Sequence, residues 1–169
     1  MKKTSFFAIC IFILSCNVLA QDTPEELYNR AIEFKKSNNC AQALILLEKA
    51  TSIKPDFGEA WLESGWCQNE LNNHQAAIIK LERAAALLKN NFRVNYELGH
   101  AWFYLDSVTS SMKYFRESIR LKPDYNLSYV GMGDLYKDKL KSTPAALTWY
   151  LKAYGIDSNH RKTNYWIGW

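Results

Sequence analysis

The sequence has little of the features that mark linkers and domain boundaries. It contains only 7 glycines and 4 prolines among 169 residues, and these form no Gly/Ser tract and no proline-rich stretch. It has no block of like charge, and no segment shows the pattern of a strand. Because flexible linkers are built from such tracts, we expect no internal domain boundary.

Residue patterns typical of catalytic and metal sites are also scarce. The three histidines, His74, His100 and His160, have no cysteine or carboxylate at metal-ligand spacing near any two of them. Glu97 and His100 lie three residues apart on one expected helix, but no second such motif completes a site, so we expect an exposed polar pair. No Gly-x-Ser-x-Gly motif is present, and neither Cys40 nor Cys67 has a histidine nearby in the sequence. We therefore expect no enzyme activity, no cofactor, no metal and no small-molecule substrate.

The charge distribution gives no sign of nucleic-acid binding. The chain has 21 Lys and Arg against 17 Asp and Glu, and loss of Lys2 and Lys3 with a leader would leave 19 against 17. Acidic residues separate the basic ones along the chain, so no basic stripe forms. These charges are expected on solvated helix faces.

The N-terminal twenty residues have the layout of a signal peptide. Lys2 and Lys3 precede a nine-residue apolar run, Phe6 to Leu14, and the segment ends in Val18-Leu19-Ala20. A helix needs about 20 apolar residues to cross a bilayer, so this run is too short for a permanent anchor. We expect a signal peptide over 1–20, cleavage after Ala20, and a periplasmic or secreted protein. An alternative is a lipoprotein that begins at Cys16, because Ile13-Leu14-Ser15-Cys16 resembles a relaxed lipobox.

Cleavage would leave two cysteines, Cys40 and Cys67, and an exported pair invites a disulfide. On antiparallel neighbouring helices Cys40 would face the region near Asn72, an offset of about 7 to 8 Å from Cys67 along the axis. A disulfide needs Cα atoms within about 7 Å in total, so this geometry argues against pairing. Cys67 is expected to be a small buried hydrophobe.

A repeated phrase indicates the fold. Lys54-Pro55-Asp56-Phe57 and Lys122-Pro123-Asp124-Tyr125 lie 68 residues apart, and Lys89-Asn90-Asn91 lies at the midpoint. A period of about 34 residues is typical of stacked helical hairpins. Amphipathic stripes and turn residues predict helices, with the ranges 24–37, 41–53, 58–71, 75–88, 92–105, 108–121, 126–140 and 144–156.

Small and bulky residues recur in phase with this period. The small position of the first helices holds Ala31, Gly65, Gly99 and Gly133, and a bulky position of the second helices holds Leu47, Leu81, Phe115 and Tyr150. The fourth unit keeps this register only with one extra residue between Lys139 and Thr143. Because helices approach closely where side chains are small, the three glycines are expected contact points.

With this alternation the chain resembles the tetratricopeptide repeat (TPR) family. The resemblance implies an all-α fold, an α-solenoid of stacked antiparallel helix pairs in a right-handed superhelix. The expected array spans 21–169, with repeats at about 24–57, 58–91, 92–125 and 126–160 and a partial fifth repeat at 161–169. It also implies a scaffold that binds a protein or peptide partner.

The resemblance further implies that certain positions of the first helices line a concave groove. The expected peptide-binding residues are Tyr28, Leu62, Trp66, Asn69, Arg93, Tyr96, His100, Phe103, Tyr104, Val130 and Asp134. Aromatic side chains give much contact area at low rotamer cost, which suits capture of an extended peptide or a helix. The alternative is that Trp66, Tyr96 and Phe103 partly fill core between hairpins. The basic clamp that grips a C-terminal carboxylate in some relatives is missing, since only Arg93 is basic there, which leaves Arg93 and His100 as expected anion contacts.

The end of the sequence leaves two expectations open. Tyr165, Trp166, Ile167 and Trp169 make the partial fifth unit apolar, whereas such arrays usually end in a polar capping helix. Either the protein continues beyond Trp169, or 161–169 forms an adhesive end for a partner or a second copy. Two functional alternatives accordingly remain: the N-terminal docking region of a longer enzyme or sensor, and a lipid-anchored envelope assembly component.

Overall fold

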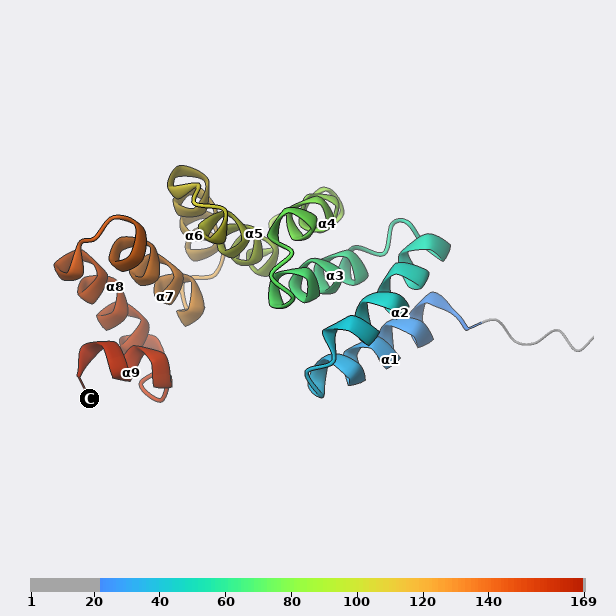
Figure 1. The fold of residues 1–169 in the computed structure, drawn as a ribbon, viewed down its shortest axis with the longest axis horizontal. Coiled ribbons are helices and arrows are strands. Elements are labelled where there is room, and N and C mark those ends of the chain that lie inside the picture. Colours follow the sequence, from blue (N-terminus) through green and yellow to red (C-terminus); the bar gives the residue numbers. More distant parts are fainter. Residues whose placement is uncertain (1–21, 169) are drawn as a thin grey trace, which may run out of the picture.

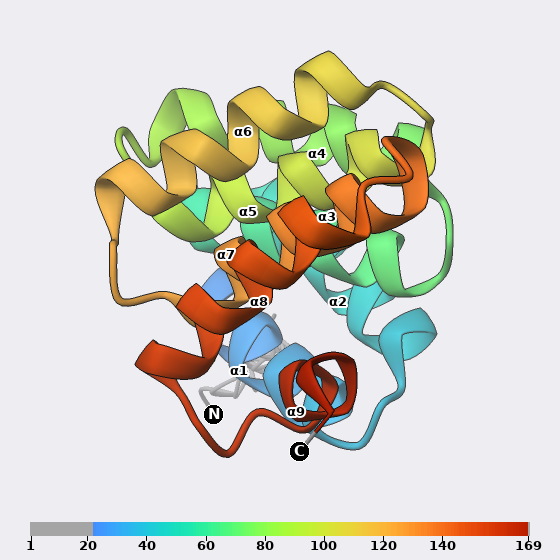
Figure 2. The same cartoon turned by 90° about the vertical axis from the view of Figure 1, so that its left-hand side faces the viewer.

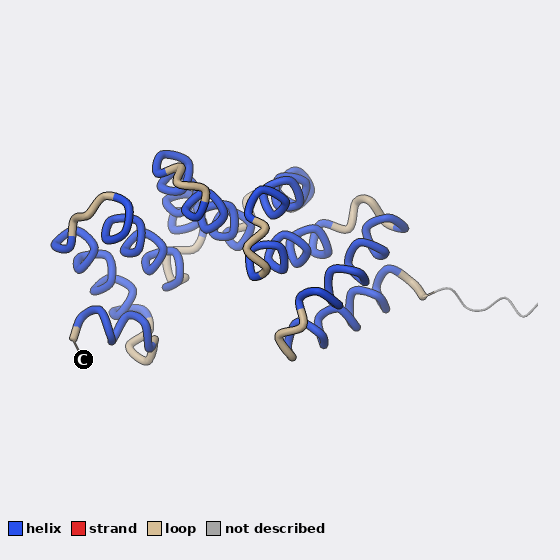
Figure 3. Tube along the Cα trace, viewed as in Figure 1, coloured by secondary structure: helices blue, strands red, loops and turns tan. Residues whose placement is uncertain are grey.

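The computed structural model of the chain describes residues 22–168, and the predicted signal peptide lies outside the described residues. The described part is helical and contains no strand (Figure 3). The helices are α1 (Pro24–Lys36), α2 (Cys40–Ile53), α3 (Gly58–Glu70), α4 (His74–Leu87), α5 (Phe92–Tyr104), α6 (Val108–Leu121), α7 (Asn126–Asp134), the π-helical turn η1 (Leu135–Lys139), α8 (Thr143–Ile156) and α9 (Arg161–Ile167). The first eight helices, with η1 counted as the end of α7, begin and end within one residue of the predicted ranges. None of the described helices is both long enough and apolar enough to cross a bilayer.

Consecutive helices form antiparallel pairs, and the pairs stack in an arch from α1 to α9 (Figure 1). The first helices α3, α5 and α7 also contact one another in turn, so they lie on the inner side of the stack. Figure 2 looks along the stack, with α7 and α8 in front of the earlier pairs. The protein is therefore an all-α solenoid, as the periodicity predicted.

The turn inside each hairpin uses one residue in the left-handed conformation. Asn38, Asn72, Asp106 and Lys141 have φ values of 60°, 60°, 60° and 54°. Asparagine and aspartate tolerate this region best among residues with a side chain, which explains three of the four. The first three turns are 34 residues apart, and the fourth follows after 35.

The extra residue of the fourth unit lies in a different place from the one predicted. It is accommodated by the π-helical turn Leu135–Lys139 at the end of α7, whereas the sequence predicted a longer turn within 139–143. A π turn inserts one residue into a helix without breaking its axis. The register of Tyr150 against Gly133 is thereby kept.

The three glycines on the first helices are close contact points, as predicted. A Cβ atom built on Gly65 would lie 2.5 Å from Leu81 Cγ, one on Gly99 would lie 2.6 Å from Phe115 Cδ1, and one on Gly133 would lie 2.4 Å from Tyr150 Cε1. Real Cβ atoms do not approach other atoms this closely. The bulky residue of each second helix therefore occupies the space that its partner glycine leaves open.

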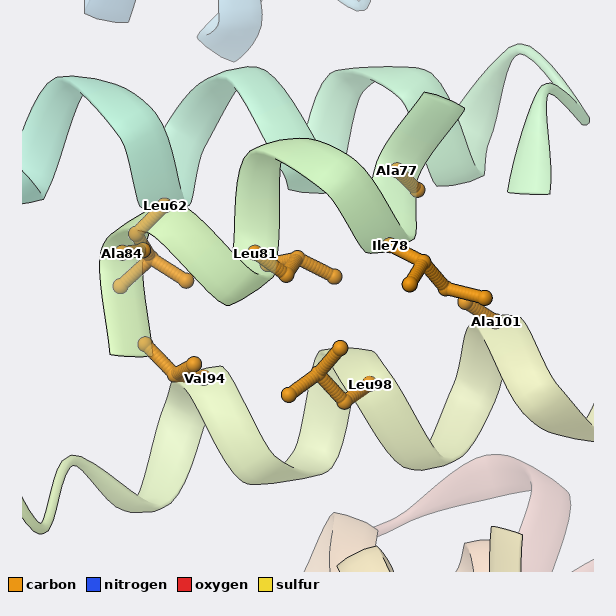
Figure 4. Packing of buried hydrophobic residues seen from close by; sticks show 8 residues of the cluster. All are labelled: Leu62, Ala77, Ile78, Leu81, Ala84, Val94, Leu98 and Ala101. Atoms are coloured by element: carbon orange, nitrogen blue, oxygen red, sulfur yellow. The ribbon is translucent and has the colours of Figure 1, made fainter. Parts of the chain in front are cut away.

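A core cluster joins the second hairpin to the third (Figure 4). Ile78 and Leu81 of α4 face Leu98 of α5, and Ala101 lies beside Ile78. Leu62 of α3 belongs to this cluster and is only 3% exposed, so the expectation that it faces the groove is wrong. The reason is that α5 packs over this side of α3 and α4. The repeat pattern alone does not define which side of a hairpin the next hairpin covers.

Cys40 and Cys67 lie together in the cluster between the first two hairpins, and both are free thiols. The two thiol groups are close enough to interact. The prediction that they form no disulfide is confirmed. Burial raises the pKa of both thiols, and the neighbouring Cys40 raises that of Cys67 further. The prediction that Cys67 is a small buried hydrophobe is confirmed, since it is fully buried.

Candidate functional site: an aromatic pocket on the inner face

A pocket with a volume of about 130 Å³ lies between α5 and α7. Six of the eleven predicted groove residues line it: Tyr96, His100, Phe103, Tyr104, Val130 and Asp134. The remaining wall residues are Phe115, Leu127, Gly131 and His160. The pocket is therefore the place where the predicted aromatic positions meet.

Helical spacing explains why α5 supplies most of the wall. Tyr96, His100, Phe103 and Tyr104 follow one another at i, i+4, i+7 and i+8, which places them on one helix face. On α7, Gly131 faces the same space, and a Cβ atom there would lie 2.6 Å from Phe115 Cζ. Only glycine lets α7 come this close to Phe115.

Tyr96 belongs both to the pocket wall and to the core. Its ring packs edge-to-face on Tyr125, with centroids 5.4 Å apart, and lies 5.9 Å from the Phe115 ring. Burial raises the pKa of Tyr96 well above its ordinary value, and the nearby Glu97 carboxyl acts in the same direction. The alternative that Tyr96 partly fills core is thus confirmed for this residue.

The rings at the outer edge of the pocket are more accessible. Tyr104 is 50% exposed and stacks on His74, with centroids 4.6 Å apart. Phe103 meets Tyr104 edge-to-face at 5.1 Å. Of these two rings Tyr104 is exposed to solvent, whereas Phe103 is half-buried and Lys139 Nζ lies 4.7 Å from its ring centroid.

One carboxylate, of Asp134, and two imidazoles, of His100 and His160, bring polarity to the pocket. Asp134 Oδ1 accepts a hydrogen bond of 2.7 Å from the Tyr150 hydroxyl. Burial raises the pKa of Tyr150, and this carboxylate raises it further. His160 caps α9, where its Nδ1 accepts from the Thr163 N–H.

The inner face of the first three hairpins is built differently, from ion pairs. Glu63 is buried and pairs with both Lys35 and Arg93, the latter at 3.0 Å between Glu63 Oε1 and Arg93 Nη2. Lys35 also covers the Trp66 ring, with its Nζ 4.0 Å from the ring centroid. Arg93, which was predicted as an anion contact for a partner, pairs here with a carboxylate of its own chain, and its side chain is 37% exposed. Tyr28 packs on Phe57, with ring centroids 5.1 Å apart.

A buried polar chain separates these two regions. Asn69 Nδ2 donates to the Glu97 backbone oxygen and to Glu97 Oε2, both at 3.1 Å, and Asn69 Oδ1 lies 3.3 Å from His74 Nδ1. Asn69 is 2% exposed and Glu97 is 5% exposed. The prediction that Asn69 lines an accessible groove is therefore wrong. The prediction of an exposed polar pair of Glu97 and His100 is wrong for Glu97. Burial raises the pKa of Glu97 to about 7, and the Asn69 hydrogen bond opposes this shift.

A spacing of 28 residues connects the two regions and was available in the sequence. Lys35 pairs with Glu63, Asn69 bonds to Glu97, and Phe103 shares the pocket with Gly131. Each pair joins the twelfth position of one repeat to the sixth position of the next repeat. Pairing of polar residues at this spacing was the signal for the role of Lys35, Glu63 and Glu97.

Models of the tetratricopeptide repeat match residues 28–92 and 92–125, which is more than half of the chain. The chain belongs to the tetratricopeptide repeat family. Family members of this kind are scaffolds for protein–protein interaction, and the fold described above agrees with that class. No curated protein sequence matches the chain.

Several solved structures share the TPR fold. MamA from Desulfovibrio magneticus RS-1 aligns with a TM-score of 0.69 at 19% identity over 82% of this chain and 77% of that one. A thermophilic TPR protein of Thermus thermophilus, TTC0263, aligns with a TM-score of 0.77 at 15% identity over 86% and 79%. An O-GlcNAc transferase of Thermobaculum terrenum aligns with a TM-score of 0.72 at 22% identity over 78% of this chain and 26% of that one. At these identities the likeness shows the fold alone.

Four pocket residues of this TPR array, Phe115, Leu127, Gly131 and His160, were not among the predicted groove residues. His160 reaches the pocket from the loop before α9, and Leu127 reaches it from the first turn of α7. The curvature that brings the start of the fifth unit toward α5 is a property of the whole stack. Among residues 22–168, no group of three His, Cys, Asp or Glu side chains could hold a metal ion.

Proposed function

We propose that this TPR array is an exported scaffold that binds a protein or peptide partner through the aromatic pocket between α5 and α7. The observation that supports the proposal most is the convergence of Tyr96, Phe103 and Tyr104 around one cavity on the inner face. Exposed aromatic rings are the side chains that most often dominate protein–protein binding energy. We further propose that the array has no catalytic role of its own.

Site-specific photo-crosslinking tests the place of binding. A benzoylphenylalanine residue replaces Tyr104, which is 50% exposed beside the pocket, and in a matched control it replaces Ile79, which is 62% exposed on α4. The proposal predicts that a protein from an envelope extract crosslinks at position 104 and not at 79. The same product should disappear when unlabelled wild-type protein is added in excess. Equal crosslinking at both positions, or crosslinking at 79 alone, would contradict the proposal.

The export proposal rests on the leader, which has basic residues, a nine-residue apolar run and a small residue at its end. Intact mass spectrometry of the native protein tests it. A mature N-terminus at Gln21 supports a soluble exported protein, and a lipidated Cys16 supports the alternative of a lipid-anchored envelope assembly component. A protein that retains Met1 would contradict export.

A second candidate function is the docking region of a longer enzyme or sensor. It is favoured by the O-GlcNAc transferase, of which this chain matches only 26%. Intact mass distinguishes the two candidates, because a native protein much heavier than 19.6 kDa would support the docking region.

Self-association through 161–169 is a further part of the proposal. Tyr165 is 73% exposed and Trp166 is 39% exposed, and the Trp166 ring stacks near Tyr150 at 6.2 Å. Sedimentation of the wild type and of a Tyr165→Ser variant tests this contact. A dimer that Tyr165→Ser converts to monomer supports it, and a wild type that stays monomeric at high concentration contradicts it.

A further inference from the structure

The two ends of the array differ in the character of their outer faces. In α3, in α5 and in α7 with η1, the third, seventh and tenth positions are buried, since they face the preceding hairpin. These positions hold Ala60, Ser64 and Cys67, then Val94, Leu98 and Ala101, then Ser128, Met132 and Leu135. In α1 the same positions hold Glu26, Arg30 and Glu33, and all three are exposed. The N-terminal end therefore has the polar outer face that is typical of a capped repeat array.

The C-terminal end of the array is apolar instead. Among the residues that the structure describes, twelve large hydrophobic side chains are exposed, and half of them lie between residues 140 and 166: Leu140, Leu147, Leu151, Ile156, Tyr165 and Trp166. Leu151 is 50% exposed at a repeat position that is charged in the three earlier hairpins, where it holds Glu48, Glu82 and Arg116. Such a concentration of exposed apolar residues is typical of an interaction surface.

The exposure of Leu147 shows where this surface lies in the stack. Its counterparts in the first two hairpins, Leu44 and Ile78, are only 9% and 3% exposed, because α3 and α5 cover them (Figure 4). Leu147 is 40% exposed. The helix α9 covers α8 only in part, since it has 7 residues and ends at Gly168, which has a φ of 81°. The uncovered part of α8 thus continues the surface on which hairpins stack in the rest of the array.

A pocket lies in this uncovered part of α8. Its volume is about 240 Å³, and its walls are Lys137, Thr143, Ala146, Leu147, Tyr150 and Trp166. A cavity of roughly 150 Å³ holds one benzene molecule, so this pocket has room for an aromatic side chain. The lysine of its wall is engaged by its own chain, since Lys137 Nζ lies 3.2 Å from Asp138 Oδ1 and 3.5 Å from the Trp166 centroid. An aromatic ring can therefore enter the pocket without meeting an unpaired cation.

The same end of the array carries an aromatic side chain that extends into solvent. Tyr165 is 73% exposed, although it is next in sequence to Trp166 of the pocket wall, and the two rings meet edge-to-face at 4.9 Å. In a contact with two-fold symmetry, a patch meets the same patch on the other copy. A patch that has both a pocket and a protruding ring suits such a contact, since each copy offers the side chain that the other accepts.

A head-to-tail contact is disfavoured by the charges at the opposite end of the array. It would bury the exposed Glu26, Arg30 and Glu33 of α1 against Leu147 and Leu151 of α8. Removing charged groups from water against apolar side chains is costly. The charges therefore favour a closed pair of copies over an open fibre.

We propose that two copies of the chain join end to end through α8 and α9 about a two-fold axis, with Tyr165 of each copy in the pocket beside Leu147 of the other. This inference rests on the proposed self-association through 161–169 and deepens it. It adds the part of α8 that takes part, the symmetry of the contact and a limit of two copies.

Sedimentation equilibrium of the full chain over a range of concentrations tests the role of α8. Leu151→Glu introduces the residue that α2 and α4 have at this position, so the hairpin should still fold. The inference predicts a wild-type dimer and at least about tenfold weaker dimerisation of Leu151→Glu. The matched control is Ile79→Glu, since Ile79 is 62% exposed on α4, and it should dimerise like wild type. Circular dichroism checks that both variants keep the helicity of wild type.

Photo-crosslinking tests the symmetry of the contact. Benzoylphenylalanine replaces Tyr165, and isotopically labelled and unlabelled copies are mixed, so that mass spectrometry identifies crosslinks between copies. The inference predicts crosslinks from position 165 to α8 of the other copy, within 143–156. Crosslinks to α1 of the other copy would show a head-to-tail contact and would overturn the inference.

The outcomes separate this inference from the proposals of the preceding section. A wild type that stays monomeric at high concentration contradicts both the inference and the self-association. A dimer that Leu151→Glu leaves unchanged keeps the self-association but overturns the contact through α8. Crosslinks from position 165 to another protein, or to residues of the same chain beyond Trp169, in place of a second copy would also overturn it. Partner binding between α5 and α7 is tested by crosslinking at position 104 and does not depend on these results.

Discussion

The inner face of the array has two regions built on the same repeat positions with different chemistry. In the first, Lys35 and Arg93 hold the buried Glu63, and the Trp66 ring is covered by Lys35. In the second, Phe103 occupies the position of Lys35, and Gly131 occupies that of Glu63. Because Phe103 and Gly131 carry no charge, they form no ion pair between the helices. A pocket of about 130 Å³ lies there.

This difference shows that the residues that stack the helices are distinct from those that line the proposed binding surface. The scaffold depends on small residues against bulky ones, and these are present in both regions. The inner face differs between the regions at pairs of residues 28 positions apart, which are the ion-paired Lys35 and Glu63 in the first and Phe103 and Gly131 in the second. The pair of Asn69 and Glu97 is intermediate between these two. Its side chains are buried and joined by a hydrogen bond, as in a closed region, but only Glu97 is ionisable.

The close helix contact common to both regions is the most sensitive point. Gly99→Leu places a branched side chain where a Cβ atom alone would lie 2.6 Å from Phe115. We expect a loss of at least about 3 kcal/mol in the free energy of unfolding, enough to unfold the third hairpin. Circular dichroism with urea denaturation measures this loss.

The control for this variant is Gly155→Ala. Gly155 lies in α8, and a Cβ atom added there would meet no other atom within 4 Å, so alanine should stabilise the helix by about 0.5 to 1 kcal/mol. A Gly99→Leu protein as helical and as stable as wild type would contradict the close packing.

The polar boundary between the regions should show a pH dependence. Because burial raises the pKa of Glu97 from 4.5 to about 7, the folded state favours the protonated carboxyl. Its contribution to stability is present below about pH 4.5 and is lost as the pH rises through 7. Glu97→Gln is neutral at every pH, so it should gain about 3 kcal/mol relative to wild type between pH 4.5 and 8.

Urea denaturation of both proteins at several pH values measures this difference. Stability curves that run parallel from pH 4.5 to 8 would contradict the buried, protonated Glu97. Asn69→Ser, which removes the amide donor, serves as a control because it should leave the pH dependence in place.

The ion pairs of the first region can be tested by Glu63→Gln. Glu63 is 4% exposed, and its loss of charge leaves Lys35 and Arg93 without their shared partner. Since both cations are partly exposed and can be hydrated, we expect a modest loss of about 1 to 2 kcal/mol. An equal loss in Glu48→Gln, whose carboxylate is 52% exposed and pairs with Lys80, would contradict a special role for Glu63.

The smallest expected effect concerns the thiols beneath the first region. Cys67 is fully buried, Cys40 is 5% exposed, and the pKa of each is raised by burial. A thiol reagent such as Ellman's should therefore react slowly with the native protein and rapidly with two thiols in urea. Rapid reaction of the native protein would contradict the closed packing, and absence of both thiols in urea would show a disulfide.

Much of the fold could be predicted from the sequence because each repeat contains the same pattern of small and bulky residues. Gly65, Gly99 and Gly133 recur against Leu81, Phe115 and Tyr150, so one irregular unit does not obscure the period. The π turn at Leu135–Lys139 was misplaced because inserting a residue within a helix or in the following turn gives the same spacing.

The residues of the candidate site were predicted only in part, because burial depends on how neighbouring hairpins pack. Leu62 and Asn69 occupy groove positions by number, yet α5 covers them. The contact between Cys40 and Cys67 was not predicted, because a residue count along the helices locates backbone atoms and not the thiol groups. His160 lines the pocket because the stack curves and brings the start of the fifth unit toward α5. This curvature could not be predicted from the position of His160 in the sequence.

The most direct test of the account is the affinity of a crosslinked partner for two double variants. Phe103→Ala with Tyr104→Ala removes the accessible rings of the pocket, and Ile45→Ala with Ile79→Ala removes two exposed residues of α2 and α4. With helicity intact in both, the account predicts at least about tenfold weaker binding for the first and unchanged binding for the second. Unchanged binding by the first variant, or an equal loss in the second, would contradict the assignment of the aromatic pocket as the binding site.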